Sequence, residues 1–307
     1  MTIIAPAGAT IPGVTHHLAA INGTELHYVT AGDSGSPILL VHGWPETWWA
    51  FRTLIPLLAR THRVFALDLR GFGDSGAGET EYGEAVSAED LHQLVAHLGA
   101  GAVHVLGQDI SGGTVFRFAA THPADVRSLI AIESTLMGYG LEALADVNGF
   151  GSWHVGFLGT PAIASMLIPG HERDLIAGWA YANMNGTPGA VSESDLDEFI
   201  RTYSRPGAWR GTEGLYHQLF LDKGETRALA EAHPITVPVL AVDGANAPFT
   251  ANTFRQVTAG EVTSVHIPGV GHLVAQEAPD ALAAAILHFT MRVEQMRVEQ
   301  MRVEQIR

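Results

Sequence analysis

One short segment constrains the fold of this chain more than any other, because it predicts a strand, a tight turn and a helix in immediate succession. The apolar run Val103–Leu106 is typical of a buried strand, and Thr114–Ala120 continues with helical spacing. Asp109 lies at the tip of the turn between them, with Gly107 two positions before it. A sharp corner pushes its central side chain out of the sheet and accepts only small neighbours. The segment therefore predicts a carboxylate that is presented for chemistry.

Two other interpretations of this turn compete with a nucleophilic Asp109. Ser111 could be the nucleophile of a serine hydrolase, but the position two before it would then be Asp109, which is not small. The turn would also begin too far beyond the strand end at Leu106. Alternatively, Asp109 could only cap the following helix, as aspartates near helix N-termini do. Candidate partners elsewhere in the chain favour the catalytic interpretation.

Composition and charge narrow the class of protein. The 307-residue chain is 47% hydrophobic, enough for a large core, and its formal charge of −15 argues against nucleic acid or an anionic membrane as a partner. The absence of cysteine excludes disulfides, thiolate metal sites and a cysteine nucleophile. Residues 1–17 have no Lys or Arg, and no later stretch has the length of a membrane span. We therefore expect a cytoplasmic enzyme.

Strands and helices alternate along the first part of the chain. Residues 1–15 are expected to form an arm on the surface, and Asn22-Gly23 between two apolar segments predicts a hairpin. The sequence further predicts strands at Pro37–Val41, Val64–Leu67 and Val126–Ile132, and helices at Trp48–Thr61 and Glu84–Leu98. Such alternation predicts right-handed crossovers and a mainly parallel sheet with helices on both faces.

This rhythm stops after the strand at Val126–Ile132. Residues 134–234 are interpreted as a helical cap, inserted between a first part of the core at 1–133 and a second part at 235–290. The predicted elements are cap helices at His171–Asn183 and Ser194–Tyr203, strands at Val237–Val242 and Val262–Ile267, and a last helix at Pro279–Thr290. A core with an inserted cap places a pocket between them, at the carboxyl ends of the strands.

The C-terminal tail, residues 291–307, repeats the five residues Met-Arg-Val-Glu-Gln. The repeat has helical propensity, and a step of five residues turns a helix by about 140°. Its Met and Val side chains therefore spiral around the helix and form no continuous seam. We interpret the tail as a frayed or lattice-contact extension of the last helix, without a catalytic role.

Several motifs in order resemble the α/β-hydrolase fold over residues 16 to 290. They are the loop His42-Gly43-Trp44-Pro45, the glycine-punctuated turn Asp68–Ser75, the corner at Asp109, the cap, and the loop Gly269–His272. The resemblance implies a mostly parallel eight-stranded sheet with an inserted helical cap. With an Asp at the corner, the chain resembles the epoxide hydrolases and the dehalogenases among the members of that fold.

The resemblance implies a two-step chemistry for these residues. An epoxide carbon accepts a carboxylate in an SN2 opening, which leaves a hydroxyalkyl ester on the enzyme. Asp109 would be the nucleophile, and His272 would deprotonate the water that hydrolyses the ester. Backbone N–H groups of Trp44 and Ile110 would stabilise the oxyanion. This chemistry requires no cofactor and no metal.

The carboxylate that orients His272 has two candidates. Glu133 directly follows one predicted strand and Asp243 directly follows another, and either could merely accept backbone N–H groups at a strand end. In families that use the later strand, the acid usually comes several residues further on, in a Gly-containing loop, and here the loop Gly244-Ala245-Asn246-Ala247-Pro248 offers none. We therefore favour Glu133 and keep Asp243 as the alternative.

The cap should supply a proton donor to the alkoxide that the opening epoxide leaves. The surroundings of His154 and Tyr216 resemble the bacterial Cif-like epoxide hydrolases, in which a His and a Tyr form this pair. The resemblance assigns ring opening to His154 and Tyr216, and the same subgroup places its acid where Glu133 stands. The alternative is that both are aromatic parts of the cap core.

The expected substrate is a small apolar epoxide, with Trp44, Met137, Trp153 and Phe157 as candidate pocket residues. A haloalkane or haloacid dehalogenase with the same Asp nucleophile is the alternative enzyme. The fluoroacetate dehalogenases hold the substrate carboxylate with arginines beside the nucleophile, whereas here Arg117 lies two helical turns beyond the corner. A non-catalytic receptor for a small ligand is the alternative outside enzymes. We expect no nucleic acid or membrane partner, and either a monomer or a homodimer.

Overall fold

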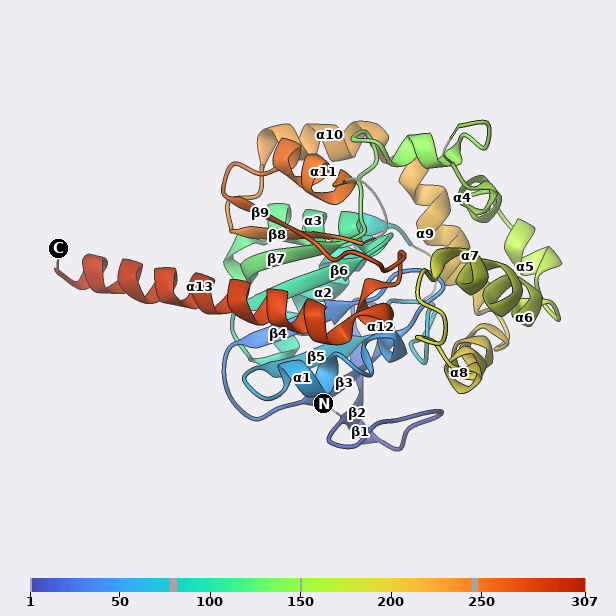
Figure 1. Ribbon diagram of the computed structural model, residues 1–307, viewed down its shortest axis with the longest axis horizontal. Coiled ribbons are helices and arrows are strands. Elements are labelled where there is room, and N and C mark those ends of the chain that lie inside the picture. The colour runs from blue at the N-terminus through green and yellow to red at the C-terminus, as the bar shows by residue number, and fades with distance from the viewer. Residues whose placement is uncertain (1, 78–81, 150, 245–247, 307) are drawn as a thin grey trace.

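The computed structural model of the protein describes residues 2–77, 82–149, 151–244 and 248–306, and its centre is one nine-stranded sheet (Figure 1). The strand order is β1-β2-β3-β5-β4-β6-β7-β8-β9. The strands are β1 (Thr2–Ile4), β2 (Thr15–Ile21), β3 (Thr24–Ala31), β4 (Pro37–Val41), β5 (Arg63–Leu67), β6 (Val103–Gln108), β7 (Val126–Ile132), β8 (Val239–Asp243) and β9 (Val262–His266). The strands from β5 to β9 in this order are parallel, and β1, β2 and β3 extend one edge in antiparallel fashion.

The sheet has nine strands rather than the expected eight, because the N-terminal arm contributes β1. This strand pairs antiparallel with residues 16–18 of β2. An edge strand presents unpaired backbone groups, and β1 satisfies part of the edge of β2. Ile3 remains 70% exposed, so the arm gains little apolar burial. With only three residues, Thr2-Ile3-Ile4, β1 is too short to show the periodicity by which a strand is predicted from sequence.

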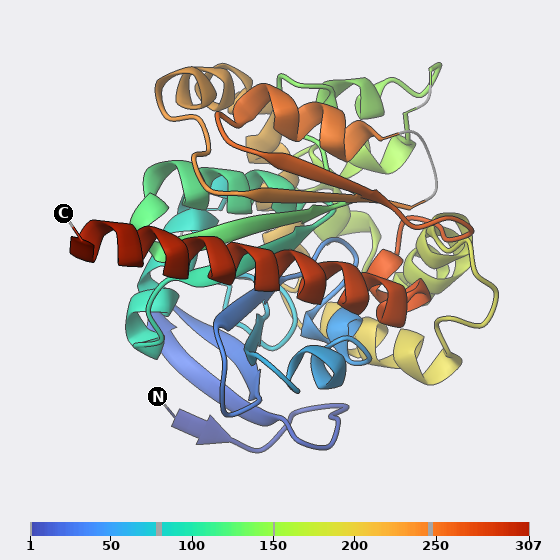
Figure 2. The ribbon, with the colours of Figure 1, turned by 60° about the vertical axis from the view of Figure 1, so that its left-hand side comes forward.

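Helices cover both faces of the sheet. In Figure 2, α13 crosses one face, and α3 and α11 lie on the opposite side. The core helices are η1 (Trp48–Phe51), α1 (Ile55–Leu58), α2 (Glu84–Leu98), α3 (Ser111–Thr121), η2 (Pro123–Asp125), α11 (Phe249–Val257), α12 (Val274–Glu277) and α13 (Pro279–Ile306). Every residue of β4, β6 and β8 is buried, as parallel strands covered on both faces require. The helix predicted at Trp48–Thr61 is two short pieces, because Pro56 lacks a backbone donor and starts a new helix.

Between β7 and β8 the described residues form helices and no strand, which gives the fold its inserted cap. The helices are η3 (Leu141–Ala145), α4 (Trp153–Leu158), α5 (Ile163–Leu167), α6 (Glu172–Leu175), η4 (Ile176–Tyr181), α7 (Ala182–Met184), α8 (Glu193–Tyr203), α9 (Trp209–Leu221) and α10 (Lys223–Ala232). The helix predicted at His171–Asn183 is interrupted, since η4 is a π-helical segment between α6 and α7. Helix α10 packs against α3 of the core.

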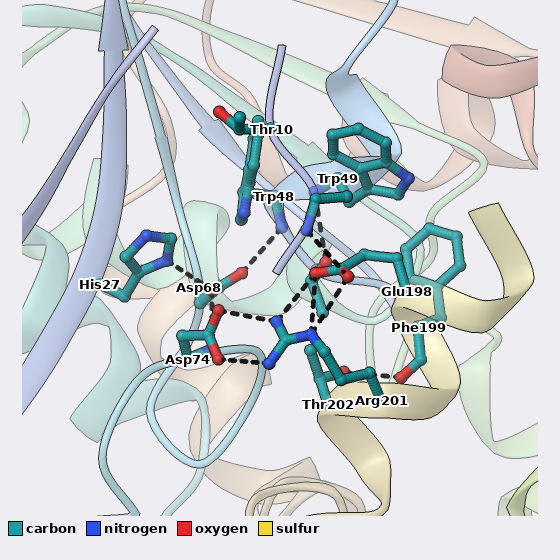
Figure 3. Close-up of polar contacts among 12 residues, drawn as sticks. Thr10, His27, Trp48, Trp49, Asp68, Asp74, Glu198, Phe199, Arg201 and Thr202 are labelled. Atoms are coloured by element: carbon teal, nitrogen blue, oxygen red, sulfur yellow. Dashed lines mark hydrogen bonds and ion pairs between the residues drawn. The ribbon is translucent and has the colours of Figure 1, made fainter. Parts of the chain in front are cut away.

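Helix α8 fastens the cap to the core through charged pairs. Arg201 donates to both carboxylate oxygens of Asp74, at 3.0 and 2.8 Å (Figure 3). One face of the same helix carries Asp195, which accepts hydrogen bonds from Arg52 at 2.6 Å and from the indole of Trp49 at 3.0 Å. The side chains of Asp195 and Arg52 are nearly buried, so these bonds are little weakened by water. The cap is therefore attached to the turns that follow β4 and β5.

Asp68 organises the turn that follows β5. Its carboxylate accepts the backbone N–H of Trp48 at 2.8 Å and of Asp74 at 2.9 Å, and it pairs with His27 at 2.7 Å (Figure 3). Gly73 has a φ of +51°, and a Cβ there would lie 2.0 Å from the carboxyl carbon of Asp68. The glycine-punctuated pattern that the sequence showed at this turn is thus a requirement for space around a buried carboxylate.

The repeat tail continues α13 without a break and leads away from the body of the molecule (Figure 1). Its first repeat is not frayed, because Val293 is buried and Glu294 accepts two hydrogen bonds at 2.8 Å from Arg127. In the outer repeats Val298, Met301 and Val303 are exposed. The interpretation of a frayed tail was therefore wrong for the first repeat.

No helix in the described ranges combines the length and the apolarity that crossing a membrane requires.

Candidate active site

Asp109 lies at a corner between β6 and α3 that its neighbours make possible. Its φ is +54°, in the left-handed region, and its backbone N–H donates to the carbonyl of Ile132 at 3.0 Å. A Cβ at Gly43 would come within 2.6 Å of the Asp109 Cβ, and a Cβ at Gly107 within 2.7 Å of Val115. The small residues that the sequence pattern showed around the corner are therefore required by close packing.

Ser111 does not take the place of the nucleophile. Its side chain is fully buried, and its hydroxyl lies 3.0 Å from the carbonyl of Val41 and 2.8 Å from that of Gln108, to which it donates. Both contacts are structural, and they tie the start of α3 to β4 and β6.

The structure brings Asp109, His272 and Glu133 together from three separate parts of the chain. His272 follows β9, and its Nε2 lies 3.2 Å from Asp109 Oδ1. Its Nδ1 lies 3.2 Å from Oε2 of Glu133, which directly follows β7. The other oxygen of Glu133 accepts the backbone N–H of Gly244 at 2.5 Å. One imidazole thus bridges an accessible carboxylate and a buried one.

The two charges at the centre stabilise each other. Burial alone would raise the pKa of Asp109, but the His272 imidazole and the backbone N–H groups of Trp44 and Ile110 outweigh it, and the pKa falls below its ordinary value. Burial would likewise lower the pKa of His272, and the carboxylates of Asp109 and Glu133 instead raise it well above 6.5. Each of the two groups therefore favours the charged form of the other.

Asp243, the alternative acid, faces another partner. Its oxygens accept the backbone N–H of Thr250 at 2.9 Å and of Ala251 at 3.5 Å, so its carboxylate caps the start of α11. Residues 245–247 of the following loop, which the sequence argument also used, lie outside the described residues. Of the two candidates, Glu133 is the one in hydrogen-bond contact with His272.

The backbone donors expected to form an oxyanion hole point at the Asp109 carboxylate. The N–H of Trp44 donates to Oδ2 at 2.9 Å, and the N–H of Ile110 also interacts with the carboxylate and lowers its pKa. Oδ2 of Asp109 thus accepts the Trp44 N–H, while Oδ1 faces His272.

Glu46 stands behind this loop and was missed, although it is the last residue of the His-Gly-Trp-Pro-Glu motif. It is fully buried and accepts the N–H of Gly43 at 3.0 Å and the side-chain amides of Gln108 and Gln276 at 2.8 Å. Burial raises the pKa of Glu46 to about 7, although the bond from the Gly43 N–H opposes the shift. Its position in the motif was a signal that could have assigned it to holding the oxyanion loop.

Glu277 holds the other catalytic loop, and nothing in the sequence marked it. Its carboxylate accepts the backbone N–H groups of Gly271 at 2.8 Å, Gly186 at 2.9 Å and Leu273 at 3.1 Å. These bonds join the His272 loop to the cap. Gly186 is far from Glu277 in the sequence, so this link to the cap cannot be found from spacing.

His154 and Tyr216, which belong to the cap, line the same cavity as Asp109. The His154 ring stacks on Trp44 at 5.1 Å between centroids, and the Tyr216 ring lies edge-on at 6.2 Å from His154. The Nδ1 of His154 bonds to Ser152 at 2.7 Å, and burial lowers the pKa of His154 to about 4. Burial raises the pKa of Tyr216 well above 10. Within the described part of the chain, His154 hydrogen-bonds only through Nδ1, and the Tyr216 hydroxyl makes no hydrogen bond to the protein.

A cavity of about 720 Å³ lies between the cap and the ends of the strands and includes Asp109, His272, His154 and Tyr216 in its lining. Its apolar wall comes from Leu141, Leu144, Val155, Trp179, Leu219 and Phe249. No Lys or Arg is among the described residues that line it.

Four residues expected in the substrate pocket do not line this cavity with their side chains. Met137 and Trp44 are buried in the core, and Trp44 contributes its backbone N–H and a surface for His154. Trp153 is 43% exposed and packs on Phe157 and Trp179 outside the cavity. The helical turn of α4 directs His154 and Val155 inward, which places Trp153 and Phe157 on its other sides.

Comparison with known proteins gives the same assignment as the motifs. The family described as alpha/beta hydrolase fold matches residues 36–164. A soluble epoxide hydrolase from Corynebacterium sp. (strain C12) is 33% identical over 287 residues, which cover 90% of this chain and 97% of that protein. The chain belongs to the epoxide hydrolase family.

Two solved structures and one further relative are also similar to this chain. The structure of the epoxide hydrolase CorEH is 32% identical, with a TM-score of 0.82 over 91% of this chain and 99% of that one. Cfl2 from Burkholderia cenocepacia is 29% identical, with a TM-score of 0.85 over 93% of this chain and 99% of that one. A fluoroacetate dehalogenase from Burkholderia sp. is 28% identical over 210 residues, 65% of this chain and 67% of that protein.

Matched amide substitutions should separate the two candidate acids. Glu133→Gln is expected to lower turnover by roughly 10²–10⁴-fold, because His272 loses the carboxylate beside its Nδ1. Asp243→Asn is expected to keep turnover within a few-fold and to lose about 1 kcal/mol of unfolding free energy at the α11 cap. Steady-state kinetics and urea unfolding of both variants make the comparison. Equal losses of turnover in the two variants would contradict the assignment of Glu133.

Proposed function

We propose that the protein hydrolyses an uncharged epoxide to a vicinal diol through an ester on Asp109. The observation that supports this most directly is the position of the Asp109 carboxylate in an apolar cavity, with His272 at 3.2 Å on the core side. Two neutral donors, His154 and Tyr216, line the same cavity from the cap. Membership of the epoxide hydrolase family supports the same reaction.

In the first step, an oxygen of Asp109 attacks one epoxide carbon and the bond from that carbon to the ring oxygen breaks. The ring oxygen keeps the electron pair and takes a proton from the Tyr216 hydroxyl, while the N–H of His154 donates a hydrogen bond to it. Since the pKa of His154 is about 4, its imidazole is neutral at working pH and donates as N–H. A hydrogen bond to the ring oxygen strengthens as charge develops there, which lowers the barrier.

In the second step, water attacks the ester carbonyl and His272 accepts the proton of that water. Glu133 stabilises the imidazolium that forms. Negative charge collects on the carbonyl oxygen, where the N–H groups of Trp44 and Ile110 receive it. Collapse of this intermediate breaks the ester bond, and the diol oxygen leaves with the remaining proton of the water. His272 then returns its proton to the site, which restores the Tyr216 hydroxyl and leaves Asp109 as a carboxylate.

The lining of the cavity favours neutral, apolar substrates. A haloacid carries a carboxylate that would need a cationic partner, and the described lining has no Lys or Arg. Arg117 is buried and interacts with Glu84 at 3.3 Å and Asp222 at 3.4 Å, away from the cavity. These features favour an epoxide over a haloacid, despite the similarity to a fluoroacetate dehalogenase.

Trapping the ester tests the proposed reaction. With styrene oxide as substrate, Asp109→Asn is expected to release no diol, and His272→Gln to accumulate a covalent adduct on Asp109 that intact-mass spectrometry detects. Tyr216→Phe is expected to slow adduct formation without slowing its hydrolysis, because the donor acts only in ring opening. Release of halide from haloacids without diol from epoxides would contradict the proposal, and so would a His272→Gln protein that gives neither adduct nor diol.

The pKa shifts predict that acid slows the second step more than the first. The lowered pKa of Asp109 keeps the nucleophile ionised near pH 5, so ring opening continues. Once Asp109 is esterified, its negative charge beside His272 is gone. His272 must then be neutral to accept a proton from water, and acid keeps it protonated. Rapid quenching and mass spectrometry should find more ester on the wild-type protein near pH 5 than near pH 8. An equal or smaller amount at the lower pH would contradict this order of events.

A further inference from the structure

A second cluster of ligand-type side chains lies outside the catalytic cavity, where α2 meets the end of α3. Glu89 and His92 are three residues apart on α2. His122 is the C-cap of α3, and Asp125 follows three residues later in η2. Two carboxylate–imidazole pairs therefore face each other across one helix–helix contact, and none of these residues lines the catalytic cavity.

The four side chains lie close together. The rings of His92 and His122 stack at 3.9 Å between centroids with 9° between their planes. Asp125 Oδ2 lies 2.5 Å from His92 Nδ1, and Glu89 Oε2 lies 3.5 Å from His122 Nε2. One ligand atom from each of His92, His122 and Asp125 can be chosen so that all lie within 4.8 Å of one another.

Charge and accessibility at this cluster suit a cation. Two carboxylates stand beside two imidazoles at the C-terminal end of α3, where the helix dipole is negative. The side chains are 25% to 40% exposed, so an ion can reach them and they can adjust. By contrast, the buried cluster of His27, Asp68 and Asp74 already uses its carboxylate oxygens on backbone N–H groups and on Arg201.

We propose that His92, His122 and Asp125 bind a Zn²⁺ ion, with solvent as the fourth ligand and Glu89 beside the site at 3.5 Å from His122. Two imidazole nitrogens and a carboxylate oxygen form a set that zinc takes in tetrahedral geometry, whereas Mg²⁺ and Ca²⁺ prefer oxygen alone. Ligand bonds of about 2.1 Å place neighbouring ligand atoms about 3.4 Å apart in a tetrahedral site. As the ion enters, the His92–Asp125 contact of 2.5 Å opens to this spacing and the two stacked rings turn until a nitrogen of each points at the ion.

The bound ion would act as a clamp between helices. It would join α2 to the end of α3, whose other end begins two residues after Asp109. The ion takes no part in the hydrolysis of the epoxide. Its effect is on the unfolding of the protein, since an ion that binds only the folded state stabilises it.

Zinc titration of matched variants tests the site. Protein dialysed against a chelator is titrated with ZnCl₂ by calorimetry, as wild type, His92→Ala, His122→Ala and His97→Ala. His97 is an exposed residue on the same helix and serves as the control. We expect saturable binding of one ion by the wild type and by His97→Ala, and an affinity lower by roughly tenfold or more in the other two.

Thermal unfolding gives a second readout that does not depend on activity. Zinc should raise the Tm of the wild type and of His97→Ala, and leave the Tm of His92→Ala unchanged. Diol formation from styrene oxide by His92→Ala without zinc should equal that of the wild type, which shows that the variant is folded. Absence of saturable binding, or equal zinc affinity in His92→Ala, His122→Ala and wild type, would overturn the proposal.

Discussion

The active site depends on one constraint: the turn between β6 and α3 must expose the Asp109 carboxylate and keep it charged. A left-handed φ of +54° at Asp109 directs its side chain away from the sheet, and this backbone conformation is costly for a residue other than glycine. The corner persists because Gly43 and Gly107 leave room for it and because Ser111 ties the start of α3 to the strands. The close packing around the corner thus maintains a backbone conformation that is unfavourable by itself.

Electrostatics explains why the same carboxylate can be both buried and reactive. Burial opposes its ionisation, and His272 with two backbone donors overcomes that penalty. Consuming the charge of Asp109 in an ester removes the main partner of His272, so the first step prepares the base for the second. The cap contributes groups of the opposite kind, because His154 and Tyr216 are neutral and can donate without disturbing the ion pair.

The sequence was sufficient where local pattern decides the structure. The corner at Asp109 and the helical cap follow from spacing, small residues and the order of strands, and the resemblance to the α/β-hydrolase fold added the His272 loop. The choice between Glu133 and Asp243 could not be made firmly, because both follow a strand directly and only tertiary contacts show which backbone donors each one meets. Strand β1 has only three residues, which is too short to show the periodicity by which a strand is predicted.

The pocket was the least predictable part, since the aromatic content of a cap segment does not tell which face of a short helix turns inward. Trp153 and Phe157 pack outside the cavity, and His154 between them lines it.

The central claim is that Asp109, and not water, attacks the substrate. One turnover of excess enzyme in water labelled with heavy oxygen tests it: the label should enter Asp109 and be absent from the diol. A labelled diol from that first turnover would contradict the account.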